Sequence, residues 1–98
     1  MIITKKQDGD KLVISLNGRL DTTTVASLEE ELGNSLEGIK DLEFDFSELE
    51  YISSAGLRVL LATQKKMTDG KTMKITHVND LVNEIFEVTG FQEFLTIE

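Results

Sequence analysis

The sequence predicts one α/β domain in which helices pack on a mixed β-sheet of about four to five strands. Its 98 residues are enough for one hydrophobic core and too few for two, so we expect the domain to span residues 1–98. Strand-like and helix-like patterns of apolar residues follow one another in the order β-β-α-β-α-β-α-β. This alternation is typical of sheets whose parallel strands are joined by right-handed helical crossovers.

The first 20 residues predict two strands joined by a tight turn. Ile2 and Ile3 lie on the first strand, and Asp8-Gly9-Asp10 supplies residues that favour a turn. From residue 12 to residue 16, leucine and isoleucine alternate with valine and serine. We therefore expect an opening hairpin, which Gly18-Arg19-Leu20-Asp21 interrupts.

The next segment predicts an amphipathic helix. Apolar side chains recur at helical spacing from Val25 to Leu32, glutamates lie beside them, and Gly33 is a suitable C-terminal stop. Asp21 or one of the threonines at 22–24 can supply the N-cap oxygen. An acidic cap would also suit the positive end of the helix dipole.

A third strand is predicted at residues 41–46. Leu42, Phe44 and Phe46 alternate there with Glu43 and Asp45, which is the pattern of a strand with one buried face. The two carboxylates are therefore expected on the face opposite the core. That placement argues against a paired acid and base for catalysis.

The second half of the chain predicts two more helices with a strand between them. The wide apolar arc of the helix that begins at Ser54 indicates close packing on the sheet, with Val59 and Ala62 on an adjoining stripe. The remaining elements are a strand through Met73 and Ile75 toward His77, a helix capped by Asn79 or Asp80 and ending at Gly90, and a short closing strand at residues 94–97.

The composition excludes several classes of function. With no cysteine and one histidine, the chain lacks the ligands of a zinc site and has no cysteine nucleophile. It has no Gly-rich phosphate loop and no nucleophile–base pair, so we expect no enzyme, no metal and no cofactor, and we expect His77 to be structural or solvent-facing. No apolar run is long enough for a signal peptide or a membrane span, which makes a cytoplasmic location the expectation.

The charge is negative overall and unevenly placed. The formal net charge of −8 argues against general affinity for nucleic acid, because phosphate binding requires a cationic patch. Residues 21–50 are strongly acidic, whereas residues 51–79 carry a net positive charge. Solvated helix faces and a surface that steers a charged partner would both account for this distribution.

The most informative stretch is the strand-to-helix junction within residues 45–61. Ser53 and Ser54 stand where the helix begins, and Ser54 in particular is expected at or beside the N-cap, with its hydroxyl accepting from a backbone N–H. The same helix end has free N–H groups and a partial positive charge, so it would also accommodate a phosphate on the serine. Position alone leaves both roles open.

Gly56 lies in the first turn of the same helix. Glycine inside a helix costs roughly 1 kcal/mol relative to alanine, so its presence there requires a reason. A backbone that must approach another segment closely would supply one, and an irregular first turn would supply another. The residues leave both explanations open.

The junction resembles the signature of the STAS-domain family, in particular the bacterial anti-sigma factor antagonists. The family pattern D-[FLV]-S-x-[LVM]-x-[YF]-[ILM]-[DS]-S-[AST]-G-L stands here as Asp45-Phe46-Ser47, Leu49 and Tyr51-Ile52-Ser53-Ser54-Ala55-Gly56-Leu57. A weaker match, Gly18-Arg19-Leu20-Asp21, is similar to the G-x-[LIV]-D that precedes the first helix of the family. The order of elements agrees over nearly the full length.

The resemblance implies a phosphorylation site and a partner-binding surface. The serine that a partner kinase phosphorylates in such antagonists corresponds to Ser54, with Ser53 as a rival acceptor where many members have aspartate. Arg58 falls where well-known members have a small residue, usually glycine, and it would either pair with a phosphate or point to solvent. The implied partner-binding residues are Asp21, Ser53, Ser54, Ala55, Gly56, Leu57 and Arg58.

The resemblance also implies a mechanism that needs no catalytic group. In partner switching, the unmodified antagonist binds an anti-sigma factor that is also a serine/threonine protein kinase, which frees the sigma factor. Phosphorylation breaks that complex, because an unpaired dianion in an interface is costly to desolvate, and a PP2C-type phosphatase restores it. The resemblance leaves one alternative, an accessory STAS subunit of a membrane lipid or solute transport system, in which Ser54 is only a cap.

Overall fold

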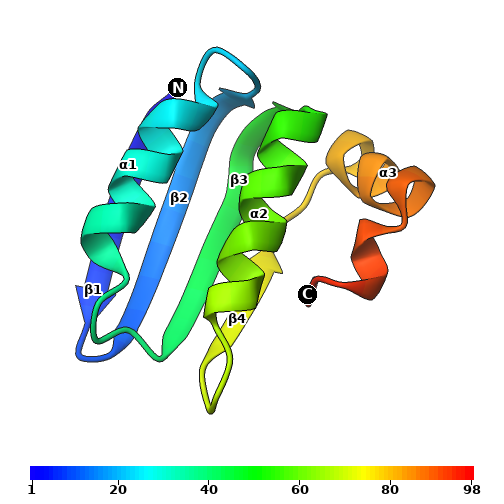
Figure 1. Cartoon of the computed structure of the whole chain (residues 1–98). Helices are drawn as coiled ribbons and strands as arrows, with labels where there is room; N and C mark the ends of the chain where they lie inside the picture. The colour runs from blue at the N-terminus through cyan, green and yellow to red at the C-terminus, as the bar shows by residue number, and fades with distance from the viewer.

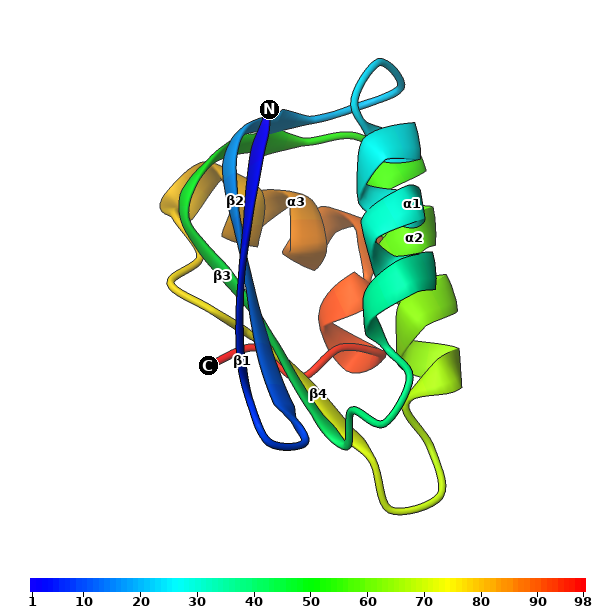
Figure 2. The same ribbon diagram turned by 90° about the vertical axis from the view of Figure 1, so that its left-hand side faces the viewer.

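In the computed structural model, which describes residues 1–98, a four-stranded sheet carries its helices on one face (Figures 1 and 2). The predicted α/β class and mixed sheet are confirmed. The elements are β1 (Ile2–Asp8), β2 (Lys11–Leu20), α1 (Val25–Ser35), β3 (Asp41–Ile52), α2 (Ser54–Lys66), β4 (Thr72–Thr76), α3 (Asp80–Thr89) and a 3₁₀ turn, η1 (Phe91–Glu93). None of the helices is both long enough and apolar enough to cross a membrane.

The strands lie side by side in the order in which they occur in the chain. β1 and β2 form the predicted antiparallel hairpin, whereas β2 pairs with β3, and β3 with β4, in parallel. Parallel neighbours require a crossover, and α1 and α2 supply the two crossovers on the same side of the sheet (Figure 2). The carboxyl ends of β2 and β3 consequently meet at one edge of the sheet.

The hydrophobic core fills the space between the sheet and the helices. Leu42, Phe44 and Phe46 of β3 point into it, as their alternation predicts, and the two phenylalanine rings lie with centroids 6.0 Å apart. Leu28 and Leu32 of α1 reach the core from the helical layer. The buried faces are therefore those that the sequence pattern indicates.

β2 and β3 both run further than the sequence pattern suggests. We expected the third strand to end at residue 46 and the hairpin to be interrupted at residues 18–21, but β2 and β3 pair as far as Leu20 and Ile52. Two register shifts, opposite Ser15/Asn17 and Gly18/Arg19, each insert one extra residue on β3. Such bulges break the alternation of apolar residues without ending the strand, which explains the error.

The end of α1 also differs from the prediction. We expected Gly33 to stop the helix, but Gly33 stays helical and the helix ends at Ser35. The glycine with a left-handed backbone in this connection is Gly38, at φ +79°. The residue able to reverse the chain therefore lies one turn later than expected.

The predicted closing strand at residues 94–97 is reduced to a single bridge between Ile75 and Ile97. Gly90 ends α3 in a left-handed conformation, as predicted, and the chain then turns through η1. Leu95 is buried beneath this turn while Phe94 is exposed. The chain thus reaches β4 too late to pair over more than one residue.

The start of α3 is fixed to the sheet by one side chain. Asn79 caps the helix, as predicted, by accepting from the Val82 N–H at 2.8 Å. Its amide nitrogen also donates to the carbonyl of Leu49 on β3 at 2.8 Å. The same residue therefore begins the helix and holds it against the sheet.

Candidate functional site

The topology brings the two predicted site segments to the same edge of the sheet. Asp21 follows the last residue of β2, and Ser53 follows the last residue of β3. The Ser53 N–H donates to the carbonyl of Leu20 at 2.9 Å, which ties the two strand ends together. The loop after β2 and the first turn of α2 therefore lie side by side (Figure 1).

The two serines take different positions at the helix end. Ser53 is the N-cap residue, with an extended backbone and a carbonyl that accepts from the Leu57 N–H at 3.0 Å. Ser54 is the first helical residue and is exposed. The expectation that a serine hydroxyl caps this helix is wrong, because Ser54 is already helical and the Ser53 hydroxyl is buried without a hydrogen-bond partner.

Ser53→Ala is expected to change the free energy of unfolding by less than about 0.5 kcal/mol, because no cap bond is lost and a buried unpaired hydroxyl is removed. Asn79→Ala is the matched comparison, since Asn79 does make its cap bond. Losing that bond, together with the bond from its amide to the Leu49 carbonyl, should cost about 1–3 kcal/mol. Urea unfolding of both variants tests this, and equal losses would show that Ser53 caps α2 in solution.

The N-terminus of α2 carries no negative charge of its own. Its first turn contains no acidic residue, and no side chain accepts from its free N–H groups. These groups and the helix dipole leave a partial positive charge beside the Ser54 hydroxyl. An anion attached to Ser54 would therefore meet a favourable field.

Gly56 allows α2 to press against the ends of β2 and β3. A Cβ at this position would lie 2.7 Å from Cγ1 of Ile52 and 2.8 Å from Cγ of Leu20, which is too close for any real side chain. Of the two explanations that the sequence left open, close approach is therefore supported. The glycine sets the distance between the first turn of α2 and the sheet.

Two residues of the expected partner-binding surface are buried. Leu57 is 3% exposed and belongs to the hydrophobic core, and Gly56 is buried against the sheet. Neither is accessible to a partner, because both lie on the side of α2 that faces the sheet. Ser54 and Arg58 are exposed, and Ala55 is largely buried at the edge of a groove described below.

Asp21 organises the neighbouring loop. Its Oδ1 accepts from the hydroxyl of Thr23 at 2.6 Å and from the N–H of Thr23 at 2.9 Å, and Arg19 Nε lies 3.7 Å from its Oδ2. Asp21 does not cap α1, because Thr24 occupies the N-cap position. The Thr23 hydroxyl, the Thr23 N–H and the Arg19 cation together lower the pKa of the Asp21 carboxyl.

The Thr23 amide resonance is expected to titrate with a pKa below 3.8, the ordinary value of an aspartate. Because the folded-state pKa is lowered, the carboxylate stabilises the loop fully at neutral pH, and this contribution is lost as the pH falls below about 4. An NMR titration measures it, with Asp21→Asn as the control that removes the transition. A Thr23 transition above 3.8 would contradict these hydrogen bonds.

Two residues of this edge were missed by sequence reasoning. Arg19 and Tyr51 are partners in the parallel ladder, and the Arg19 guanidinium carbon lies 4.5 Å from the centre of the Tyr51 ring. Each stands one residue before the end of its strand. That shared position is a signal, but it can be used only once the pairing of β2 with β3 is known.

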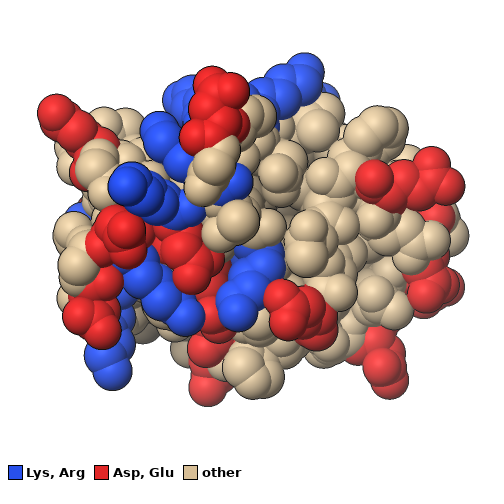
Figure 3. All heavy atoms as spheres, turned by 90° about the horizontal axis from the view of Figure 1, so that it is seen from below, with Lys and Arg blue, Asp and Glu red and all other residues tan.

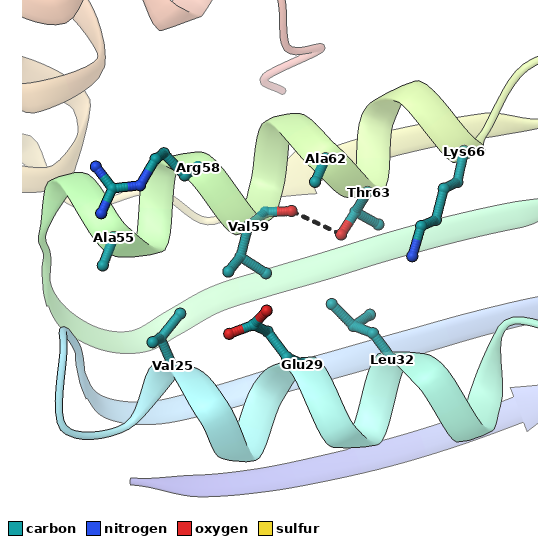
Figure 4. Close-up of a pocket in the computed structure, with 9 residues that line it drawn as sticks. All are labelled: Val25, Glu29, Leu32, Ala55, Arg58, Val59, Ala62, Thr63 and Lys66. Carbon is teal, nitrogen blue, oxygen red and sulfur yellow. Dashed lines mark hydrogen bonds between the residues drawn. The ribbon is translucent and has the colours of Figure 1, made fainter.

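A groove of about 410 Å³ runs between α1 and α2 and begins at the first turn of α2 (Figure 4). The sequence assigned Val59 and Ala62 to the stripe that adjoins the sheet-facing side, but both line this groove and Ala62 is exposed. Charged side chains lie on both walls, with Glu29 on α1, and Arg58 and Lys66 on α2. The groove thus extends the surface that contains Ser54.

The remaining candidate residues lie on the sheet face that no helix covers. Glu43 is within 4 Å of Lys11 and Lys74, and Asp45 Oδ1 lies 3.2 Å from Nδ1 of His77, so both carboxylates face away from the core as predicted. Burial alone would raise the pKa of Asp45, but Ser47 and His77 lower it more. His77 is largely exposed, and no three His, Asp or Glu side chains are arranged to hold a metal ion.

The charged side chains are distributed unevenly between the two ends of the molecule. Seen from below, Lys and Arg side chains lie toward β1 and the middle with Asp and Glu among them, whereas the only charged side chains at the end formed by α3 are Asp and Glu (Figure 3). Residues 80–98 contain five acidic residues and no Lys or Arg. The acidic character of the chain is therefore most uniform at the end formed by α3.

Comparison with known proteins places these features in a family. The family described as "Mlab, STAS domain" matches residues 3–97. BtrV of Bordetella bronchiseptica, which is named as an anti-sigma factor antagonist, is 33% identical over 94 residues, covering 93% of this chain and 80% of that protein.

Solved structures share the fold. An anti-sigma factor antagonist from Mycobacterium paratuberculosis superimposes with a TM-score of 0.89 at 22% identity, covering 98% of this chain and 83% of that one. Unphosphorylated SpoIIAA superimposes with a TM-score of 0.84 at 15% identity, over 99% of this chain and 88% of its own. Phosphorylated SpoIIAA from Bacillus matches with a TM-score of 0.75 at 14% identity, over 99% of this chain and 91% of its own.

Proposed function

Because the chain belongs to the STAS-domain family, we propose that it is an anti-sigma factor antagonist, a regulator that binds an anti-sigma factor and so releases a sigma factor. The observation that carries this proposal is the exposed Ser54 on the first turn of α2, beside the Asp21 loop. The name of the 33% identical relative supports the same function. Such a regulator works by binding and has no reaction of its own to catalyse.

Phosphorylation of Ser54 is the proposed switch. A phosphoserine adds roughly −1.5 to −2 charges at neutral pH. The free N–H groups of the helix end would accommodate that charge in the isolated protein, so the fold is retained. In an interface the same charge must be desolvated, which weakens the complex. The existence of a fold neighbour in phosphorylated and unphosphorylated forms is consistent with this switch.

Ser53 is a poorer acceptor than Ser54. Its hydroxyl oxygen is buried, so a kinase could not reach it without opening the start of α2. Ser54 is exposed, and its side chain makes no hydrogen bond that would have to be broken. The partner-binding surface that we propose therefore consists of Asp21, Ser54 and Arg58, with the largely buried Ala55 at its edge.

The proposed partners act on this one surface in turn. The anti-sigma factor is a serine/threonine protein kinase that binds unmodified Ser54 and then phosphorylates it, and a PP2C-type phosphatase removes the phosphate. All of these steps are expected in the cytoplasm and involve no direct contact with nucleic acid. The exposed cation Arg58, one turn from Ser54, is placed to attract an anionic group.

Incubation with ATP and the kinase encoded nearest to this gene tests the assignment. Mass spectrometry should find one phosphate, on Ser54, and Ser54→Ala should remain unmodified while Ser53→Ala is phosphorylated normally. A phosphate on Ser53, or none at all, would refute the Ser54 switch. Neighbouring genes for a transporter permease and ATPase, with no kinase, would instead favour an accessory subunit of membrane transport.

A further inference from the structure

Exposed apolar side chains are concentrated in the last part of the chain. Of the five large apolar residues that are exposed, Leu81, Val88 and Phe94 lie within residues 80–98. Leu81 is 50% exposed, Val88 78% and Phe94 62%. Single exposed apolar residues are normal on a protein surface, whereas a group of them in one segment is typical of a surface that binds another molecule.

An apolar stripe runs along α3. Leu81, Ile85 and Val88 are spaced by four and three residues, so their side chains leave the same face of the helix. Ile85 is only partly buried, and the seven residues from first to last span about 10 Å. In the turn that follows, the exposed Phe94 ring packs edge to face on Phe91, with ring centroids 6.4 Å apart.

The two exposed residues of the apolar stripe are not needed to hold α3 on the domain. Val82 and Phe86 are fully buried and attach the helix to the hydrophobic core. Asn79 fixes the start of the helix through its bond to the Leu49 carbonyl. The exposed ends of the apolar stripe are therefore available to another molecule.

An acidic stripe lies beside the apolar stripe. Asp80, Glu84 and Glu87 repeat the same spacing one residue earlier, and all three are exposed. Glu87 accepts a hydrogen bond from Asn83, but none of the three carboxylates forms an ion pair. Because residues 80–98 contain no Lys or Arg, this end of the molecule shows uncharged surface bordered by Asp and Glu (Figure 3).

The acidic stripe does not stabilise α3. Like charges three and four residues apart repel each other on a helix surface. Asp80 in the first turn suits the helix dipole, but Glu87 lies near the C-terminal end, where the dipole favours a cation. The stability of the helix therefore does not account for these carboxylates, whereas a positively charged partner would.

We propose that α3 is a second docking surface, which binds a basic amphipathic helix of another protein. The apolar ridge of that helix packs on the apolar stripe, and its Lys or Arg side chains pair with the acidic stripe. The two stripes contain no residue of the surface proposed around Ser54. The docking therefore does not depend on the phosphorylation of Ser54.

The charge of α3 selects this partner over other occupants of an exposed apolar surface. A second copy of the chain would place one acidic stripe close to another. A membrane of anionic lipids and a nucleic acid would both be repelled by the unpaired carboxylates. A helix with Lys or Arg beside its apolar ridge matches both stripes at once.

A synthetic peptide of about 18 residues, long enough to form a helix, serves as the probe. It consists of leucine and lysine, with the leucines spaced three and four residues apart so that they share one face. In an NMR titration of the isotope-labelled protein, this peptide should shift the amide resonances of residues 80–94. A peptide of the same composition in scrambled order, and one with glutamate in place of lysine, should each bind at least about tenfold more weakly.

Paired variants separate the two stripes from net charge. Val88→Asp removes an apolar contact while adding a negative charge, and it should weaken binding about tenfold. Thr68→Asp adds the same charge at an exposed residue outside α3 and should not weaken binding. Glu84→Lys should weaken binding at least about tenfold, and Glu30→Lys, the same change on α1, should weaken it less. Circular dichroism spectra equal to that of wild type are expected, because all four side chains are exposed.

Several results would overturn the proposal. Absence of shifts in residues 80–94, equal binding of the scrambled peptide, or equal effects of Val88→Asp and Thr68→Asp would leave only general attraction to an acidic protein. A wild-type dimer in sedimentation equilibrium that is lost in Val88→Asp would assign α3 to a second copy. Vesicles of phosphatidylglycerol and phosphatidylcholine that bind wild type but not Val88→Asp would assign it to a membrane.

Discussion

Ser54→Asp is expected to abolish binding of the anti-sigma factor kinase while leaving the fold unchanged. The new carboxylate would stand at the uncapped N-terminus of α2, where the helix dipole tolerates it. In the complex the new carboxylate would have to lose its hydration in an interface formed around a neutral hydroxyl, at a cost of about 2–5 kcal/mol, which corresponds to roughly 30-fold to several thousand-fold weaker binding. Isothermal titration calorimetry against the kinase measures the loss, and circular dichroism checks the fold.

Two variants control this result. Ser54→Ala should bind the kinase as well as wild type, because it removes the phosphate acceptor without adding charge. Thr68→Asp adds the same charge at an exposed residue beyond the other end of α2 and should also leave binding unchanged. If Ser54→Asp binds as tightly as these two, the proposed interface does not contain the first turn of α2.

Gly56→Ala is expected to lower the free energy of unfolding by about 1–3 kcal/mol, which is the usual cost of overpacking a core. The added methyl group would lie 2.7 Å from Ile52 and 2.8 Å from Leu20, and both side chains are fully buried and unable to withdraw. The fall in melting temperature should be about 4–8 °C for each kcal/mol in a domain of this size. Thermal unfolding followed by circular dichroism measures it.

Gly33→Ala is the matched control for this effect. Gly33 is also helical, but a Cβ there would meet no atom within 4 Å. Alanine should therefore stabilise α1 by up to about 1 kcal/mol, through helix propensity alone. Opposite signs for the two substitutions would establish the close approach at Gly56, and equal stabilisation by both would disprove it.

The parts of the fold that could be predicted are those that rest on local periodicity. Leu42, Phe44 and Phe46 alternate strictly, so their strand and its buried face followed from the sequence alone. The continuation of β3 to Ile52 could not be predicted, because the inserted bulge residues shift the alternation. The prediction of a closing strand was wrong over most of its length. The apolar residues near Ile97 favour a strand, but the chain turns through η1 before it reaches β4, and only Ile97 then forms a bridge.

The sequence predicted which segments form the candidate site, but not which way their side chains point. Asp21 and Ser54 were placed near one another by family resemblance, and the parallel pairing of β2 with β3 supplies the physical reason. The side-chain direction of Leu57 was missed, because a motif does not distinguish residues that touch a partner from residues that hold the helix in place. The groove was missed because it depends on how α1 and α2 lie relative to each other.

The single bridge between Ile75 and Ile97 affects where a strand from another chain could pair with this sheet. The Ile75 N–H donates to the Thr96 carbonyl, and the Glu98 N–H donates to the Ile75 carbonyl, each at 2.9 Å. These bonds occupy the outer edge of β4, so an extended strand from another chain would have to displace them first. β1, by contrast, has no neighbour on its outer side. Strand addition is thereby hindered at Ile75 of β4, and at the β1 edge the charges of Lys5 and Lys6 discourage it.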